Sequence, residues 1–555
     1  MKQSGSRRGR EAIENHHADH RFHPRGNFGA HVGTVGGVVG AASGRAGECV
    51  AVPQSDNRFQ TRLLTDEVET ASYFLLLRPL YNIYFHPLRR YPGPKLWAAS
   101  SLPWGFSFLS GYWHHRALQL HTQYGHVVRI GPNELSFDVP EAWEDVYGRS
   151  KHRKENPKAP WYLNPKTKEI VSARLEEHTR MRRLLGIGFT NTAMLEQEPL
   201  IKSHVDLFIQ RLHEINSGGK AAVDMFEWFA YCTFDIIGDL SFGEPFGCLR
   251  DSMLHPWIAW VFANIKLAHT LVLCNRIPFF FLFLPIRQTL ALVKGAGYFE
   301  KTMKAVTDRR LARDAERPDF LQIMKTPRGN SVHCLFQFMT REEIHSNASF
   351  LTMAGSETTS NSMVVAVYMI CLYPETKAKI IDELAATFNT ESEIDMRSAG
   401  KLTYLMAVIQ ESMRYHPPGP NALWRITPSG GNEILGDWLP AKTILGIPHR
   451  VMYRSEHNFK HANEFIPERW LDVEGEQSEF ANDRRDSFHP FSYGPRTCLA
   501  VNLAYAEMRY ILARLMWNFD FELAEQSRNW ADGLRAWLIW EKRPLYVHLK
   551  PRRSK

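Results

Sequence analysis

The ten residues from Phe491 to Ala500 constrain this chain more than any other segment. They place an aromatic ring, a glycine, an arginine and Cys498 in one short loop, directly before an expected helix over 502–517. A free cysteine is most often a buried, inert side chain. Backbone N–H groups, a helix N-terminus or a bound iron favour a thiolate instead. Because Gly494 lets the backbone turn close to a flat cofactor and Arg496 can pair with a carboxylate on it, the spacing predicts that Cys498 ligates such a cofactor.

Composition indicates a large globular protein. Of the 555 residues, 44% are hydrophobic, which is enough for a sizeable core. The net charge of +8 is spread along the chain, whereas nucleic-acid binding would require a concentrated basic stripe, so we expect no nucleic-acid partner. The seven cysteines are widely spaced without a CxxC pair, which argues against both a disulfide framework and a zinc site and favours a reducing compartment.

One long helix is expected in the second half of the chain. Thr340 and Glu343 form a capping box, and the helix that begins there runs to about Cys371, roughly 45 Å at 1.5 Å per residue. A polar patch over 354–359 interrupts its apolar pattern. Gly355 costs about 1 kcal/mol relative to alanine, and hydroxyl side chains can bond back to the preceding turn, so we expect the helix to be loosened there.

The other elements are predicted to be helices with a few short strands. A β-hairpin is expected from 126–130 and 134–137, and short strands from 434–445. Further helices are expected from Pro374 onward and over 402–415. The sequence therefore predicts a mainly α fold with small β-sheets, of the α+β class.

The first 75 residues are predicted to be a poorly structured extension. They are rich in Gly, Arg, His and Ser, and their charges exclude the apolar core of a signal peptide. The apolar run from Ala71 to Leu77 is far shorter than the roughly 20 residues of a membrane-spanning helix. Residues 76–555 show no clear linker, and we expect a single catalytic domain.

The loop around Cys498 resembles the FxxGxRxC signature of cytochrome P450 enzymes, and the similarity extends from about Tyr81 to the C-terminus. The resemblance implies haem b, buried between the long helix on its oxygen side and the cysteine loop. Cys498 would be the axial iron ligand, whose electron donation assists O–O cleavage. Phe491, Gly494 and Arg496 would contact the cofactor. The family usually has glycine where this chain has Ala500, and we expect haem binding to survive the additional methyl group.

The polar patch of the long helix matches the family's (A/G)GxE/DT segment. The resemblance implies that Glu357 and Thr358 are an acid–alcohol pair relaying protons to the distal oxygen, since general acid work needs a held hydroxyl and a refillable proton source. From the residues alone, a tolerated kink in a buried helix is the favoured explanation of the patch.

Glu411 and Arg414 lie three residues apart on one helix face. Most pairs of this kind are surface bridges worth roughly 0 to 1 kcal/mol. The family's ExxR pair is instead buried behind the cysteine loop, where it is joined by the arginine of a PERW-like motif, here Arg469. The resemblance thus implies a structural charge network in which loss of one partner costs several kcal/mol.

Haem propionates require cations, and arginine suits planar bidentate contacts. Besides Arg496, the positions that match the family are Arg182 and Arg425, with His178 in a position consistent with a propionate contact. A solvated basic helix face is the alternative, and Arg180 or Arg183 can substitute for Arg182.

The stretch from Trp257 to Leu284 is rich in aromatic residues, including four phenylalanines within 279–283. Core packing is expected for most of these rings. The stretch also matches the position of the family's mobile lid, which would give a lipophilic substrate an apolar mouth.

Two further segments, 81–88 and 234–243, resemble the filamentous-fungal secondary-metabolism branch that includes trichothecene-pathway hydroxylases such as isotrichodermin hydroxylase. The resemblance implies oxidation of a small lipophilic terpenoid or polyketide by O2. NADPH-cytochrome P450 reductase would supply electrons, with cytochrome b5 as a second donor. It also implies peripheral membrane contact at the cytosolic face of the endoplasmic reticulum.

Two other functions remain open at this stage. One is a haem-thiolate isomerase or dehydratase that does not consume O2, and the other is a non-catalytic haem carrier or sensor. Retention of both Glu357 and Thr358 argues against both of them.

Overall fold

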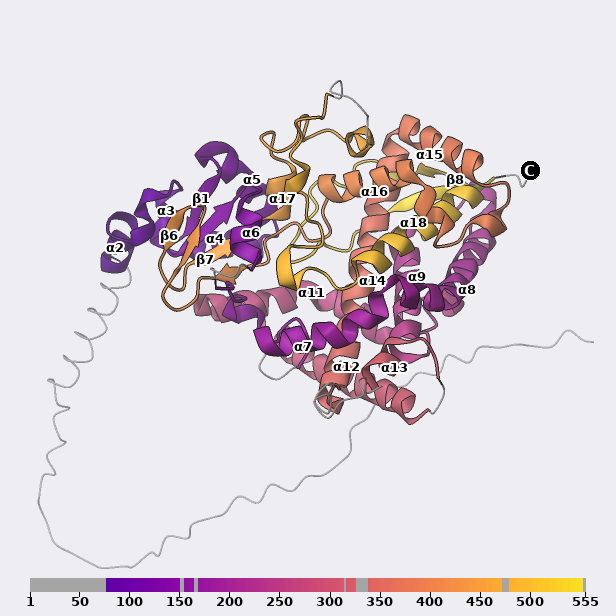
Figure 1. Cartoon of the computed structure of the whole chain (residues 1–555), viewed down its shortest axis with the longest axis horizontal. Coiled ribbons are helices and arrows are strands. Elements are labelled where there is room, and N and C mark those ends of the chain that lie inside the picture. The colour runs from indigo at the N-terminus through magenta and orange to yellow at the C-terminus, as the bar shows by residue number, and fades with distance from the viewer. Residues whose placement is uncertain are drawn as a thin grey trace, which may run out of the picture. The chain divides into compact units, whose positions relative to one another are not determined.

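The computed structural model describes residues 76–149, 154–163, 168–313, 316–325, 338–471 and 479–552. The predicted N-terminal extension, Cys49 and Cys334 lie outside these residues, so the predicted domain boundary stays a prediction. The arrangement of the described elements is drawn in Figure 1.

Helices make up most of the fold. In the first half of the chain they are α2 (Arg78–Tyr84), α3 (Lys95–Ala99), α4 (Leu102–Leu109), α5 (Trp113–Tyr124), α6 (Ala142–Tyr147), α7 (Leu175–Leu185), α8 (Asn191–Ile215), α9 (Met225–Phe242), α10 (Cys248–Asp251) and α11 (Pro256–Arg276). In the second half they are α12 (Ile286–Ala312), α13 (Phe320–Lys325), α14 (Arg341–Leu372), α15 (Pro374–Thr387), α16 (Thr403–Tyr415), α17 (His449–Tyr453) and α18 (Val501–Asn518).

The strands form three small sheets. One has the order β1-β2-β7-β4, a second β3-β9-β8, and the third pairs β5 with β6. Their bounds are β1 (Val127–Gly131), β2 (Glu134–Phe137), β3 (Ala222–Asp224), β4 (Arg425–Ile426), β5 (Asn432–Ile434), β6 (Asp437–Leu439), β7 (Ile444–Gly446), β8 (Phe519–Leu523) and β9 (Tyr546–Pro551). The predicted hairpin is confirmed as the antiparallel pair β1 and β2, and β7 joins β2 in parallel register.

The long helix α14 is confirmed close to its predicted bounds. The side chain of Thr340 accepts the backbone N–H of Glu343, and the Glu343 side chain accepts the backbone N–H of Thr340. The helix is not interrupted at the polar patch, contrary to the expected loosening. The hydroxyls of Ser356 and Thr358 each donate to the carbonyl four residues earlier, and this is compatible with continuous helix. A Cβ at Gly355 would lie 3.0 Å from Ile237, so the glycine permits close packing on α9.

The main hydrophobic core joins α8, α9, α14, α16 and α18. Helix α9 is buried along almost its whole length. A second core cluster lies around Trp104 and Trp113, near the first sheet, and holds the C-terminal part of α11. Figure 1 shows the same division, with β1, β6 and β7 near α2 and with α15, α16 and α18 grouped elsewhere.

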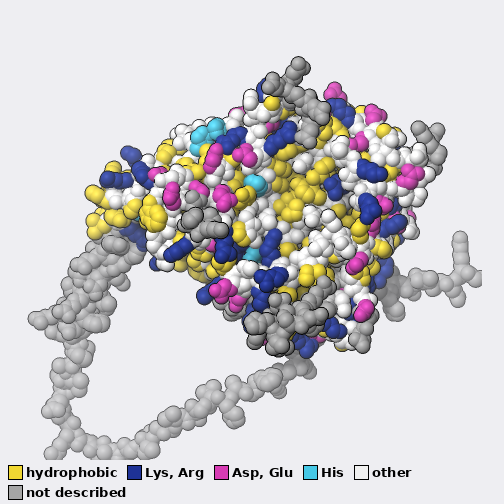
Figure 2. All heavy atoms as spheres, viewed as in Figure 1, with side chains coloured by type: hydrophobic (Ala, Val, Ile, Leu, Met, Phe, Trp, Pro, Cys, Tyr) yellow, Lys and Arg dark blue, Asp and Glu magenta, His cyan; other side chains and the backbone are white. Residues whose placement is uncertain are grey.

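The phenylalanine-rich segment after α11 is a 3-10 helix, η6 (Pro278–Phe283). Phe280 is buried, but Phe279 and Phe281 are 43% and 52% exposed, so the expectation that most of these rings pack in the core is wrong for these two. Exposed apolar side chains also gather on α2, where Figure 2 shows them at one end of the face drawn. Among the described residues, no helix is both long and apolar enough to cross a bilayer.

Candidate active site

Two side chains are accessible within otherwise buried surroundings. Thr358 is exposed although its neighbours Glu357 and Thr359 on α14 are buried. Cys498 is also exposed, yet burial is the largest influence on its thiol and raises its pKa. A sulfur atom that is both deep in the protein and accessible faces internal space. Leu423 repeats this pattern, because it is 46% exposed between neighbours that are at most 3% exposed.

The cysteine loop is held by its own backbone. The N–H of Cys498 donates to the carbonyl of Phe491 over 2.8 Å, and the Thr497 hydroxyl lies within 3.0 Å of two loop carbonyls. The backbone of Ala500 hydrogen bonds to the thiol and acts with Arg182 to lower its pKa against the larger effect of burial. The loop thus favours a thiolate only in part, and a bound cation at the sulfur would complete the stabilisation.

Gly494 is required by its own backbone conformation and by a close contact with α6, whereas the sequence suggested an approach to a cofactor. Its φ is +74°, and an added Cβ would lie 2.3 Å from the backbone oxygen of Tyr147, at the end of α6. Ala500, in contrast, has a φ of −98°, which any L-residue adopts, so the backbone here does not need a glycine.

A cluster of cations lies beside this loop. The Nε of Arg496 donates to Glu155 over 2.6 Å, and Arg425 lies 4.0 Å from the same carboxylate. An isolated β-bridge pairs Lys158 with Arg425. The predicted residues Arg182 and His178 belong to the same cluster, since Arg496, Lys158, Arg182 and Arg425 all lower the pKa of His178, with burial as the larger cause.

The charges of this cluster do not balance. Arg182, Arg425 and Arg496 contribute three positive charges, and Lys158 adds another when it is protonated. The carboxylates that act on Lys158 are Glu155 and Glu169, so positive charge exceeds negative charge among these residues. Burial together with Arg425 and Arg496 lowers the pKa of Lys158 to about 7. An excess of positive charge in a partly desolvated site destabilises the protein unless a bound anion compensates it.

Of the two substitutes considered for Arg182, Arg183 is exposed and Arg180 contacts a different part of the protein. Arg180 points to the start of α14, where it pairs with Glu343 and donates to the Phe338 carbonyl. Arg182 instead donates to the carbonyl of Thr497, directly before the cysteine, over 2.6 Å.

Glu357 is held on one side only. Its Oε2 lies 3.3 Å from the ammonium group of Lys542, and both side chains are at most 12% exposed. The rings of Phe226 and Phe262 flank the same ammonium group at 5.3 Å and 5.0 Å. Oε1 of Glu357 is buried without a hydrogen-bond partner among the described residues, and so is the amide nitrogen of Asn361, one helical turn later.

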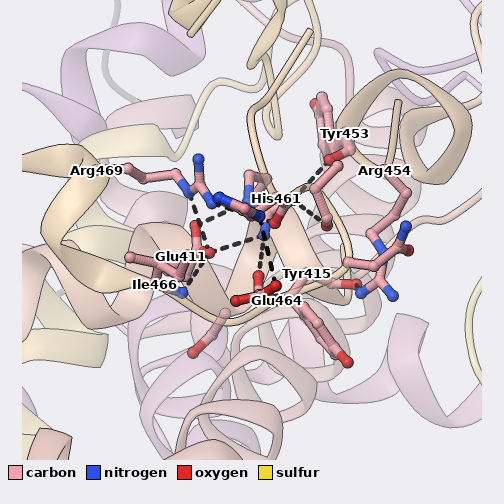
Figure 3. A network of polar contacts seen from close by, with 12 residues as sticks. Glu411, Tyr415, Tyr453, Arg454, His461, Glu464, Ile466 and Arg469 are labelled. Atoms are coloured by element: carbon pink, nitrogen blue, oxygen red, sulfur yellow. Dashed lines mark hydrogen bonds and ion pairs between the residues drawn. The ribbon is translucent and has the colours of Figure 1, made fainter. Parts of the chain in front are cut away.

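The Glu411–Arg414 pair is completely buried and fully satisfied. Figure 3 shows Glu411 beside Arg469 and Ile466. The two contacts within the pair are 2.8 Å and 2.7 Å long, and Arg414 also donates to the carbonyls of Tyr453, Ala462 and Glu464. Arg469 joins Glu411 at 3.3 Å and pairs with Asp483. The charges of two arginines and two carboxylates therefore balance. Because Glu411 and Arg414 are both buried, they do not form a surface bridge.

This network supports the segment that leads to the cysteine loop. Trp470 donates to Glu411 over 2.8 Å and packs on Phe488 at 4.5 Å between ring centroids. Tyr453, whose carbonyl binds Arg414, accepts the backbone N–H of His489 at its hydroxyl. Through Trp470 and Tyr453 the buried charge network thus holds the segment that leads to the cysteine loop.

Comparison with known proteins decides the family. The family described as Cytochrome P450 matches residues 92–547, which include all of the site residues named above. The chain is a cytochrome P450. It is therefore a haem-thiolate monooxygenase that uses haem b, and the fold predicted from the resemblance is confirmed.

The similar proteins are fungal. Cytochrome P450 monooxygenase bet2 of Neocamarosporium betae is 55% identical over 86% of this chain and 92% of its own length. Averantin hydroxylase of Dothistroma septosporum is 42% identical over 85% and 88%, and trichothecene C-15 hydroxylase of Fusarium sporotrichioides is 40% identical over 87% and 97%. These relatives confirm the predicted branch of fungal secondary metabolism.

The residues of this P450 fit its cofactor. Cys498 is an accessible sulfur whose thiolate form a bound cation would stabilise, and the excess of positive charge beside it suits the carboxylates of the haem propionates. Sequence reasoning missed Lys158, Glu155, Lys542 and Asp483. Glu155 and Lys158 lie in a segment with several prolines and no motif. Lys542 and Asp483 meet their partners only in the folded protein, so the sequence offered no signal for any of the four.

Proposed function

We propose that this P450 oxidises a small lipophilic secondary metabolite, a terpenoid or a polyketide, in a chamber lined by Thr358, Leu423 and Cys498. The observation that carries the proposal is the accessibility of these three side chains within buried surroundings. The names of the relatives support the substrate class, since two are hydroxylases named for averantin and for a trichothecene.

In this proposal the haem supplies the oxygen chemistry when bound. Cys498 holds the iron, with Phe491 and Gly494 shaping the loop. Arg182, Arg425 and Arg496 hold the propionates, together with Lys158. The guanidinium of Arg496 donates to the carboxylate of Glu155, so a carboxylate can bind it in this geometry.

Glu357 and Thr358 are proposed to move protons into the chamber. The accessible Thr358 hydroxyl is held by the Ala354 carbonyl at 2.8 Å, which orients it without blocking its oxygen as an acceptor. Glu357 is buried beside it, and its unpartnered Oε1 is suited to hold a water molecule that refills the hydroxyl. A haem carrier would not need this arrangement, and neither would an isomerase that does not consume oxygen.

Electrons are proposed to come from NADPH-cytochrome P450 reductase, with cytochrome b5 as a second donor. Peripheral contact with the cytosolic face of the endoplasmic reticulum is proposed through the exposed apolar side chains of α2 and η6. Those on α2 include Leu80 and Tyr84, Leu77 and Phe85 flank the helix, and η6 adds Leu282, which is 79% exposed.

Spectroscopy with the purified protein tests the ligand. The reduced protein under carbon monoxide is expected to show the thiolate-specific absorption band, and Cys498→Ser is expected to abolish it. A band that persists in Cys498→Ser would overturn the assignment of the iron ligand. Thr497→Ser, which keeps a hydroxyl and leaves the thiol in place, is the matched control and is expected to retain the band.

Turnover with reductase tests the function. Consumption of NADPH and O2 that depends on a bound metabolite is expected, and candidate metabolites can be found by the optical change that accompanies their binding near the iron. Thr358→Ala is expected to release hydrogen peroxide at the expense of product, whereas Thr359→Ala, at the buried neighbouring position, is the control. Unchanged product yield in Thr358→Ala would mean that the proton relay lies elsewhere.

A further inference from the structure

A cluster of histidine and arginine side chains lies where four parts of the chain meet. His114 belongs to the first turn of α5, His416 directly follows α16, and Arg450 lies in α17. Trp540 comes from the fourth part, the segment between β8 and β9. Helix α17 packs against both α5 and α16, and Figure 1 shows α17 beside α5. We call these four residues the histidine–arginine cluster.

The ring of Trp540 joins the other three side chains. The ring of His416 stacks on it with 3.8 Å between ring centroids, and the ring of His114 meets it edge-on at 4.7 Å. The guanidinium carbon of Arg450 lies 5.9 Å from the same ring centre. The indole N–H of Trp540 donates to the carbonyl of Pro417 over 2.7 Å, which fixes the ring. Three side chains that can donate hydrogen bonds therefore converge on one fixed aromatic ring.

The positive charge of Arg450 is not balanced within the cluster. Burial and, as the smaller cause, the charge of Arg454 lower the pKa of Arg450 to about 9. No carboxylate among the described residues pairs with Arg450, and its Nε is buried without a hydrogen-bond partner there. Part of Arg450 is nonetheless accessible, whereas His114 and His416 are buried. A small ion from solvent can therefore compensate a cation that the chain leaves unpaired.

The two histidines supply neutral donors next to this cation. His416 is 6% exposed, and its Nε2 has no hydrogen-bond partner among the described residues. Burial is the main cause that holds the pKa of His416 well below its ordinary value, and Arg450 is the next. The same two causes lower the pKa of His114 to about 2. A buried ring nitrogen without a partner is unfavourable, and beside a cation its N–H form suits an anion.

Neither of the two charge clusters near the cysteine loop compensates Arg450. The cations that act on His178 beside that loop are different residues, and none of them acts on His114 or Arg450. Glu411 acts on Arg454, but the buried network behind the loop already binds both of its carboxylate oxygens. The histidine–arginine cluster is thus a separate excess of positive charge, which requires an anion of its own.

The surroundings favour a small monovalent anion. The cost of removing water from an ion rises steeply with its charge, and one arginine cannot offset the desolvation of a phosphate or sulfate dianion. An organic carboxylate binds best to the flat side of a guanidinium through two hydrogen bonds, but the Nε of Arg450 is buried. A single spherical ion can instead contact Arg450 and a histidine N–H together.

We propose that His114, His416 and Arg450 bind a chloride ion against the ring of Trp540. The ion balances the charge of the arginine and links α5, α16, α17 and the C-terminal segment. The chain that follows His416 holds the Trp540 indole at Pro417 and continues to Leu423, which lines the proposed chamber. Chloride thus stabilises the segment that carries Leu423. The inference does not depend on the proposed function, because the ion takes no part in the reaction.

Chloride NMR of the haem-loaded protein, reduced and bound to carbon monoxide, tests the site. This form is diamagnetic and its iron is closed to halides, so broadening of the chloride signal reports ions bound to the protein. We expect a saturable broadening, and Arg450→Met is expected to weaken chloride binding by about 10-fold or more. Arg116→Met is the matched control, because Arg116 is an exposed arginine of α5 that donates to Gln119 over 3.2 Å. Equal broadening in Arg450→Met and the parent would overturn the proposal.

Thermal inactivation separates ion binding from simple packing of Arg450 on Trp540. The half-life of the carbon monoxide band is measured at elevated temperature in sodium chloride and in sodium gluconate of equal ionic strength. An ion that binds only the folded protein is expected to lengthen the half-life of the parent, by up to about 10-fold when chloride is about ten times above its dissociation constant. Arg450→Met is expected to show the same half-life in both salts. A chloride effect that persists in Arg450→Met, or is missing in the parent, contradicts the site.

A second variant and a crystal keep the test decisive. If Arg450→Met does not fold, His416→Phe keeps a ring stacked on Trp540 but removes the donor, and we expect it to weaken chloride binding by about 3-fold or more. Crystals of the haem-loaded protein grown in bromide are expected to show an anomalous peak between Arg450 and His416. Bromide bound only elsewhere would overturn the proposal. Loss of the carbon monoxide band in the parent would instead count against the proposed haem site.

Discussion

Two clusters of charge lie near the cysteine loop, and they differ in the balance of their positive and negative charges. In the network behind the loop, two arginines meet two carboxylates, and Glu411 is held on both oxygens (Figure 3). Beside the loop, three arginines and Lys158, whose pKa burial and the arginines lower to about 7, meet two carboxylates. A cluster whose charges balance stabilises the protein by itself, whereas a surplus of one sign requires an ion or ligand that the chain does not provide. Charge balance thus separates a structural network from a binding site.

The largest effect is expected when one charge is removed from the balanced network. Glu411→Gln leaves Arg414 and Arg469 buried with one carboxylate between them, and we expect it to cost about 3–5 kcal/mol of the free energy of unfolding. Glu468→Gln, next to Arg469 in the chain, is the matched control, since it breaks an ion pair with Lys379 that is 51% exposed at the lysine. Denaturant unfolding measures both. Equal stability of the two variants would contradict a structural role for the buried network.

The unbalanced cluster is expected to respond in the opposite way. Arg496→Met removes one surplus charge, so the haem-free protein is expected to keep or gain stability, while affinity for haem falls by about 10- to 100-fold through loss of a charge-assisted hydrogen bond. The rate of haem transfer to an excess of apomyoglobin measures the loss. Arg485→Met, on the exposed segment before the loop, is the control. A variant that lost stability but held haem as tightly as the parent would place Arg496 in a structural role.

These differences also show which parts of the site the sequence could predict. Local patterns sufficed for Cys498, for the capping box at Thr340 and for the spacing of Glu411 and Arg414, because each depends on residues within a few positions of one another. The P450 resemblance added Arg182, Arg425 and Arg469 as candidates. The balance of charge could not be predicted, since Glu155 and Lys158 meet Arg496 across more than 300 positions.

The fold was predictable for similar reasons. Periodicity and caps placed α14, α16 and the β1–β2 hairpin close to their observed bounds. The expectation that most rings of the 257–284 stretch pack in the core does not hold for Phe279 and Phe281, because apolarity alone does not distinguish a core segment from an exposed apolar surface. The continuity of α14 at Gly355 was also missed, since the close packing of Ile237 that stabilises it is a tertiary contact.

Glu357 is intermediate between the balanced and the unbalanced cluster, because Lys542 binds one of its oxygens and the other has no hydrogen-bond partner among the described residues. Lys542→Met removes its cation while keeping the length of the side chain, and we expect product formed per NADPH to fall by about 10-fold as the carboxyl loses its fixed position. Lys542→Arg is expected to restore most of the yield. Lys377→Met, which breaks a more exposed lysine–carboxylate pair with Asp520, is the control for general destabilisation.

A double variant shows whether Lys542 acts through Glu357. If it does, Lys542→Met combined with Glu357→Gln loses no more product than Glu357→Gln alone. Additive losses would mean that the lysine has a separate role in folding or substrate binding.

Glu507 on α18 extends the comparison to a buried carboxyl whose pKa no cation lowers. Burial alone raises its pKa from the ordinary 4.5 to about 8. Between these values the folded protein keeps a proton that the unfolded chain has released, so the free energy of unfolding falls as pH rises through this window. Glu507→Gln removes this dependence. We expect the variant to gain about 1 kcal/mol relative to the parent between about pH 6 and about pH 7, near the limit of about 1.4 kcal/mol per pH unit for one proton. Urea unfolding at the two pH values, with the exposed Glu525→Gln as control, measures the difference, and a constant gap between variant and parent would show that a cation or ligand does neutralise this carboxylate.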